Sequence, residues 1–124
     1  MQQNAINWFE IPVTDMTRAR KFYSAILGVE ITPMADAPTP YAFFPVEMTQ
    51  SSVGGALSQD GGQKPSQDGT VVYLNCDPDL AVVERRVEAA GGKVLLPKMS
   101  IGENGFMAFI LDTEGNKVGL HSMK

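Results

Sequence analysis

The chain has 124 residues, of which 44% are hydrophobic, and its formal net charge at pH 7 is −4. This length suits one compact domain with its own core, and the negative charge argues against nucleic acid or an anionic membrane surface as a partner. No run of about 18 apolar residues is present, so we predict no membrane-spanning helix.

The N-terminal residues and the cysteine content predict a cytoplasmic protein. Residues 1–7 have neither a basic segment nor an apolar stretch of the length that a signal peptide needs. Cys76 is the single cysteine, so no disulfide can form within the chain, and a reducing compartment is expected. Because Cys76 stands in an apolar strand pattern, a buried thiol is favoured over a catalytic one.

The first half of the chain begins with a strand pattern and a helix pattern. Residues 5–13 are typical of a strand. Asp15 follows as the expected N-cap of a helix with one apolar face, and Gly28 is placed to end that helix. Three further strands are expected at residues 29–33, 41–47 and 52–58.

The second half repeats this order after a polar, Gly-bearing linker at residues 59–69. Residues 70–76 predict a strand, and Asp77 and Pro78 are expected to open the second helix, with Pro78 at its first position. The helix should bury an apolar stripe made of Leu80, Val83, Val87 and Ala90 and end at Gly91 and Gly92. Three strands are expected to follow at residues 93–96, 105–112 and 117–122.

The chain therefore reads as two βαβββ modules, residues 5–58 and 70–122, joined by the linker. Gly28 lies 13 positions after Asp15 in the first module, and Gly91 lies 14 positions after Asp77 in the second. Repetition of this kind indicates one supersecondary unit used twice. We predict a single α+β domain, 1–124, in which the two modules form a curved mixed sheet around a concave pocket.

Two motifs make the chain similar to a known family. The first is D-x-x-x-A-x-x-F-Y-x-x-x-L-G from Asp15 to Gly28, and the second is D-x-x-G-N-x-x-x-L from Asp112 to Leu120. With them the chain resembles the vicinal oxygen chelate superfamily, which includes glyoxalase I, bleomycin-resistance proteins and extradiol dioxygenases, and within it the small bacterial lactoylglutathione-lyase-related proteins. The resemblance implies a pocket on the concave face and a metal held there by side chains from the first and last strands of each module.

The positions where the resemblance implies metal ligands carry other residues. They are Trp8, Val71, Gly119 and, by the best alignment, Gly55. None of these side chains offers a nitrogen or carboxylate suited to a metal. We therefore expect neither the family metal nor another cofactor.

Strand alternation selects the residues expected to line the pocket, because every second residue shares a face. Trp8, Tyr73 and Asn75 are predicted to bind the ligand, although Trp8 and Tyr73 could also serve packing. Glu10 is a candidate base or an anchor for a ligand's amine or hydroxyl, and the alternative is a structural carboxylate with a Lys, Arg or backbone partner. His121 is a candidate acid, or simply a residue of a terminal strand.

Three functions are compatible with this pattern. The first is metal-independent binding of a small organic molecule between the modules. The second is a metal-independent lyase or isomerase of a small carbonyl compound with Glu10 as base, and the third is a structural or interaction role with a filled pocket. A homodimer is expected in each case, since modules of this family often pair across chains.

Overall fold

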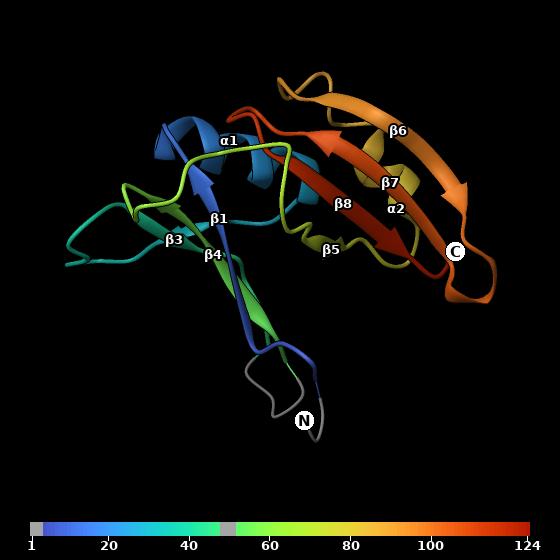
Figure 1. Ribbon diagram of the computed structural model, residues 1–124, viewed down its shortest axis with the longest axis horizontal. Helices are drawn as coiled ribbons and strands as arrows, with labels where there is room; N and C mark the ends of the chain where they lie inside the picture. The colour runs from blue at the N-terminus through green and yellow to red at the C-terminus, as the bar shows by residue number, and fades with distance from the viewer. Residues whose placement is uncertain (1–3, 48–51) are drawn as a thin grey trace.

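The two modules form two separate four-stranded sheets in the computed structural model, which describes residues 4–47 and 52–124 (Figure 1). The first module contains β1 (Trp8–Val13), α1 (Met16–Leu27), β2 (Thr32–Pro33), β3 (Tyr41–Phe43) and β4 (Gly54–Gln59). The second contains β5 (Tyr73–Asn75), α2 (Leu80–Glu84), β6 (Lys93–Ser100), the 3-10 helix η1 (Gly102–Asn104), β7 (Phe106–Leu111) and β8 (Lys117–Ser122).

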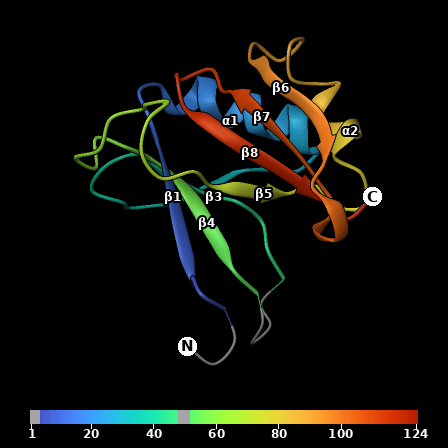
Figure 2. The same ribbon diagram turned by 45° about the vertical axis from the view of Figure 1, so that its right-hand side comes forward.

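The two sheets have the same strand order, β1-β4-β3-β2 and β5-β8-β7-β6. In each sheet the first strand of the module pairs in parallel with the last strand, and the other pairs are antiparallel. The predicted repeat of two βαβββ modules is therefore confirmed. Figures 1 and 2 show the sheets set at an angle, with the N-terminal end of β1 projecting beyond the second sheet.

Helix α1 begins and ends where the sequence predicts. The Asp15 side chain accepts a hydrogen bond from the backbone N–H of Arg18 at 3.0 Å. Gly28 adopts a left-handed conformation with φ of 67° and donates its N–H to Ser24 O at 3.0 Å. Both contacts satisfy backbone groups that a helix leaves unpaired at its ends.

Helix α2 begins later than predicted, with Asp79 rather than Asp77 and Pro78 at its start. The Asp79 side chain accepts from Ala81 N at 2.9 Å, as an N-cap does. The Asp77 side chain instead accepts a hydrogen bond from Met123 N, beyond the end of β8, at 2.9 Å.

The strands differ from the prediction mainly in length. Strands β3 and β5 have three residues each and are shorter than expected, whereas β6 has eight and continues through Pro97. A proline has no N–H for a ladder, but β6 is an edge strand and its register with β7 shifts around Pro97. The edge position therefore permits a strand that the sequence pattern appeared to end.

One hydrophobic core includes residues of both modules. In the first module, the apolar face of α1, including Phe22 and Ile26, packs in the same buried cluster as Ile11 and Leu57 of the sheet. In the second, Leu80 and Val83 of α2 are buried, and so is Val87, which follows the helix because α2 ends at Glu84 rather than at the predicted Gly91 and Gly92. Ala90 is only partly buried. None of the described helices is long and apolar enough to span a membrane.

Residues 112–116, which we call the inter-module turn, connect the second module to the first through polar contacts. Tyr23 donates its hydroxyl to Asp112 Oδ2 at 2.6 Å. Glu114 Oε1 accepts from Asp15 N at 2.8 Å, and Asn116 Nδ2 donates to Pro12 O at 2.8 Å. The turn thereby holds the end of β1 and the start of α1 against the second sheet.

The linker is also attached to the second module. Ser66 N donates to Asn116 Oδ1 at 3.1 Å, and Lys117 N donates to Ser66 O at 3.2 Å. The linker reaches β5 by way of the region between the two sheets (Figure 1). This path brings linker residues to the rim of a cleft between the modules.

Candidate ligand-binding cleft

A cleft of about 1110 Å³ lies between the two modules. The side chains that line it come from β1, from β5 and its preceding residues, and from the linker. Trp8 and Glu10 belong to the first wall, and Tyr73 and Asn75 belong to the second. The structure thus places four of the five predicted site residues around one cavity, and their roles stay predictions.

Glu10 and Trp8 are joined through a residue that the sequence analysis missed, Tyr41. The Tyr41 hydroxyl donates a hydrogen bond to Glu10 Oε2 at 2.7 Å and accepts one from Trp8 Nε1 at 3.0 Å. Partial burial and then the hydrogen bond to Glu10 raise the pKa of Tyr41 above its ordinary value. The carboxylate is therefore held in one orientation by a neutral phenol.

Small residues on β4 allow this contact. Strand β4 lies between β1 and β3, and its residues Gly54 and Ala56 pair with Trp8 and Glu10 and so share their face. With little side-chain volume there, Tyr41 on β3 reaches across β4 to Glu10. The small residues at alternate positions of β4 were a signal for this contact, but only the strand order shows which residues they bring together.

Glu10 does not occupy the interior position that the sequence suggested. Strand β1 is an edge strand of its sheet rather than a central one, and the Glu10 side chain is exposed. An exposed carboxylate stays hydrated and needs no buried counter-charge. The apolar neighbours Phe9 and Ile11 point to the opposite face, which packs against the core.

An aromatic ring lies over a glycine at corresponding positions of the two modules. Trp8 on β1 pairs with Gly54 on β4, and Tyr73 on β5 pairs with Gly119 on β8. A Cβ at residue 54 would lie 3.1 Å from Trp8 Cζ3, and one at residue 119 would overlap the Tyr73 ring. Each glycine therefore provides the space in which its aromatic partner lies flat against the sheet.

This pairing corrects two of the positions inferred from the sequence. Tyr73 pairs with a glycine of the last strand of its module, as Trp8 does, so Tyr73 rather than Val71 is the counterpart of Trp8. Val71 precedes β5. Gly55 points away from Trp8, and a Cβ there would overlap Phe9 on the opposite face, so Gly54 is the residue that shares the face of Trp8.

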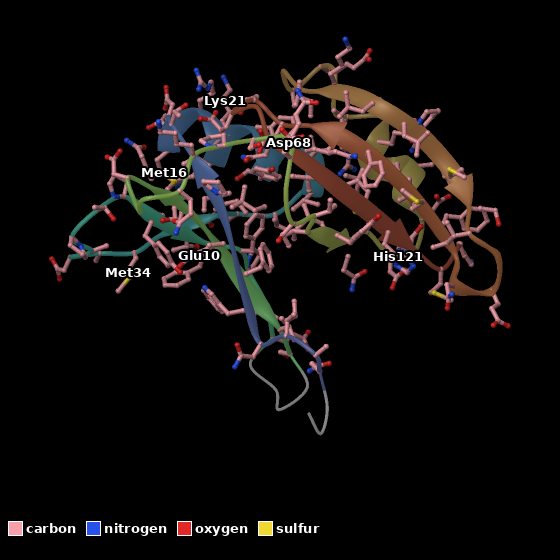
Figure 3. All side chains as sticks on the ribbon, viewed as in Figure 1. Glu10, Met16, Lys21, Met34, Asp68 and His121 are labelled. Carbon is pink, nitrogen blue, oxygen red and sulfur yellow. The ribbon has the colours of Figure 1, made fainter. Side chains whose placement is uncertain are left out.

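His121 does not join Glu10. It lies on β8 and pairs with Asn75, but its Nε2–H donates to Asn104 O at 2.7 Å, and the residue is not among those lining the cleft. Figure 3 shows Glu10 and His121 on different sheets, well apart. The proton-transfer pair considered from the sequence is therefore not formed, and His121 instead holds the loop that contains η1.

Cys76 is buried, as predicted. Its side chain contacts Leu74 O at 3.5 Å, and burial raises the pKa of the thiol to about 11. A thiol with a raised pKa is almost entirely protonated at neutral pH and is a poor nucleophile. The geometry therefore favours a packing role.

Residues 5–120 match the sequence profile of the glyoxalase/bleomycin resistance protein/dioxygenase superfamily. The chain belongs to this superfamily. Among relatives of this glyoxalase-superfamily chain, CFP32 of Mycobacterium bovis is 31% identical over 124 residues, covering 96% of the chain and 46% of the relative. A glyoxylase-like domain-containing protein of Didymella fabae is 32% identical over 117 residues, covering 90% of the chain and 88% of the relative.

Solved structures of the superfamily share the fold. A glyoxalase/bleomycin resistance protein from Albidiferax ferrireducens T118 superposes with a TM-score of 0.74 at 18% identity, covering 98% of this chain and all of the other. A glyoxalase I mutant from Zea mays gives a TM-score of 0.69 at 23% identity, covering 93% of this chain and 44% of the other. The chain thus spans about half the length of the maize enzyme and of the mycobacterial relatives it matches.

The residues of this superfamily member do not fit the metal that the resemblance implies. The paired positions on the first and last strands of the modules carry Trp8, Gly54, Tyr73 and Gly119. Across residues 4–47 and 52–124, no three His, Cys, Asp or Glu side chains gather where they could hold a metal ion. The indole of tryptophan and the phenol of tyrosine are not the ligands by which proteins hold divalent metals, and glycine has no side chain that could bind one.

Proposed function

We propose that the chain binds a small organic molecule in the cleft between the modules without the help of a metal ion. The observation that carries this proposal is the replacement of the implied ligand set by the two rings of Trp8 and Tyr73, with Glu10 and Asn75 beside them on the same cleft. Aromatic walls with a few polar groups are the usual composition of a small-molecule site. The cleft's volume of about 1110 Å³ is slightly above the usual range of about 300 to 1000 Å³.

The test uses Trp8, the single tryptophan of the chain, as a reporter inside the cleft. Small molecules are screened with two readouts, Trp8 fluorescence emission and thermal unfolding, each measured with and without EDTA. We expect ligands that change the emission also to raise the melting temperature. At a ligand concentration a hundredfold above Kd, the free energy of unfolding should rise by about 2.7 kcal/mol. EDTA should leave both effects unchanged.

The Trp8→Phe variant is the matched control for this screen. It should lose the emission signal and still show stabilisation by a ligand that contacts several residues of the cleft. Ligand binding that disappears with EDTA, or stoichiometric uptake of nickel, zinc or manganese by the protein, would contradict the metal-independent site.

A second candidate function is a metal-independent lyase or isomerase of a small carbonyl compound with Glu10 as base. The Tyr41–Glu10 hydrogen bond of 2.7 Å favours it, because a general base must be held in one orientation toward the proton it removes. His121 does not supply the acid in this scheme, since its Nε2–H is bonded to Asn104 O. Consumption of a hit compound in the same screen, measured by mass spectrometry, distinguishes this enzyme from a binding protein.

We also propose that the chain forms a homodimer in the cytoplasm. Large apolar side chains are exposed on β6 and just after it, namely Leu95, Met99 and Ile101. Exposed apolar patches on a soluble chain commonly mark an interaction surface. Light scattering during gel filtration should give twice the mass of the chain, and Met99→Glu should reduce the mass to that of one chain. A single-chain mass for the unaltered protein would contradict the dimer.

A further inference from the structure

The cleft combines a positioned carboxylate with exposed aromatic rings, and we propose that its ligand is an organic ammonium ion. This inference rests on the proposed binding function and specifies the chemical class of the ligand. The ammonium group would lie between Glu10 and the faces of the Trp8 and Tyr73 rings, with its organic part also against these rings.

Glu10 supplies the anionic partner. The bond from Tyr41 occupies one site on Oε2, whereas a carboxylate can accept about four hydrogen bonds. The side chain lines the cleft and is exposed to it. A ligand N–H donor can therefore form a charge-assisted hydrogen bond with a carboxylate that is already oriented, so little conformational freedom is lost on binding.

The aromatic rings supply the second part of the site. The side chains of Trp8 and Tyr73 are large yet 42% and 48% exposed, and both line the cleft. The face of an aromatic ring attracts a cation within about 6 Å of its centre, and tryptophan does so most strongly. Elsewhere on this protein such contacts are already filled by its own cations, as with Lys117 Nζ at 4.2 Å from the centre of the Phe109 ring.

The remaining charged groups on the cleft leave a negative balance. Asp68 and Lys64, both from the linker, line its rim. Together with Glu10, the described lining residues therefore carry two carboxylates and one positive charge, that of the Lys64 side chain. Figure 3 shows Asp68 on the segment that connects the two sheets. An anionic ligand, such as a carboxylate or an enolate, would find a single cation and two like charges here, whereas a cation is also attracted by the chain's net charge of −4.

The test compares three probes of similar shape and different charge, namely benzylammonium, benzyl alcohol and benzoate. Each is titrated at pH 7.5 and about 0.1 M salt, with Trp8 emission as the readout. We expect benzylammonium to bind roughly ten times more tightly than benzyl alcohol, and benzoate to bind least. Glu10→Gln keeps the side-chain volume, and it should lower the affinity for benzylammonium about tenfold while changing that for benzyl alcohol less than about twofold.

Glu103→Gln is the matched control, because it removes one negative charge at an exposed position on η1 that does not line the cleft. It should leave the affinity for benzylammonium unchanged within about twofold, since exposed charges beyond roughly 10 Å are largely screened. An equal loss in Glu10→Gln and Glu103→Gln would overturn the assignment of the ammonium group to Glu10.

The outcomes also separate this inference from the proposed function. If benzyl alcohol or benzoate binds as tightly as benzylammonium, the ammonium class is wrong and the cleft remains a small-molecule site. The ammonium inference is overturned if none of the three probes changes Trp8 emission at concentrations up to about 10 mM. A Kd above this concentration corresponds to a binding free energy weaker than roughly 3 kcal/mol. The broader screen described above then decides the proposed function by itself.

Discussion

Glu114→Ala should lower the free energy of unfolding by about 3 kcal/mol, which corresponds to roughly 10 °C in melting temperature. The Glu114 side chain is fully buried and accepts hydrogen bonds from Thr14 N at 2.9 Å, Asp15 N at 2.8 Å and Arg18 Nε at 2.7 Å. Removing it leaves backbone donors at the start of α1 without their acceptor. Chemical denaturation at pH 7 measures the loss.

The same side chain predicts a dependence on pH. Burial alone would raise the pKa of Glu114, but the hydrogen bond from Arg18 and those from Asp15, Thr113 and Thr14 outweigh it and lower the pKa to about 2. A carboxyl group with a lowered pKa stabilises the fold fully above its ordinary pKa of 4.5. This stabilisation is lost as the pH falls from 4.5 to about 2.

Glu114→Gln is the matched variant for this effect, because it keeps the volume and one acceptor oxygen but cannot be ionised. It should be less stable than the unaltered protein at pH 7, and the difference should shrink as the pH falls from 4.5 toward 2. A difference that stays constant over this range would show that the charge of Glu114 is not what stabilises the contact.

Asp112→Ala should cost at least about 3 kcal/mol, because it removes the acceptor of several buried hydrogen bonds at once. Asp112 is 4% exposed and accepts from Tyr23 OH at 2.6 Å, from Glu114 N at 2.9 Å, and from both Asn116 N and Asn116 Nδ2. The buried Tyr23 hydroxyl would be left without its partner. Thermal unfolding followed by circular dichroism measures the change.

Tyr23→Phe keeps this prediction testable if Asp112→Ala does not fold. It removes only the hydroxyl of the contact between the modules and should cost about 1.5 kcal/mol. Combined with Asp112→Asn in a double-mutant cycle, it should show a coupling free energy of about 1 kcal/mol. Strict additivity would mean that the hydroxyl and the carboxylate do not stabilise each other.

The inter-module turn gives the second of the two sequence motifs a structural role. In the sequence, residues 112–116 are recognisable as a turn and as part of the resemblance, but their role is not apparent. The structure shows that Asp112 and Glu114 each contact the first module across about ninety or more positions of the chain. Local periodicity contains no information about contacts between residues so far apart in the chain. The contacts of the inter-module turn could therefore be found only from the tertiary structure.

For the candidate site, too, the sequence pattern predicts some of the residues and the tertiary structure is needed for the others. Alternation along the two strands is enough to predict that Trp8, Glu10, Tyr73 and Asn75 line the cleft, because the faces of a strand follow directly from its sequence, and their roles there stay predictions. It could not find Tyr41, whose hydroxyl meets Glu10 only because β3 lies on the far side of β4. Nor could it decide whether His121 faces Glu10, since the two lie on different sheets.

The register between strands accounts for the other corrections. The resemblance to the family implied ligand positions at Val71 and Gly55, whereas the residues that form the aromatic–glycine pairs are Tyr73 and Gly54. A shift of one residue reverses the face of a strand, as it does for Gly55 and Gly54.

Local periodicity, capping and composition were enough to predict the two βαβββ modules, the ends of the first helix and the residue types at the implied ligand positions. Three features required the folded structure: which strand is an edge, which side chains meet across β4, and how the inter-module turn holds the modules around the cleft. These features depend on strand order and on contacts between residues far apart in the chain, and a linear pattern does not specify either.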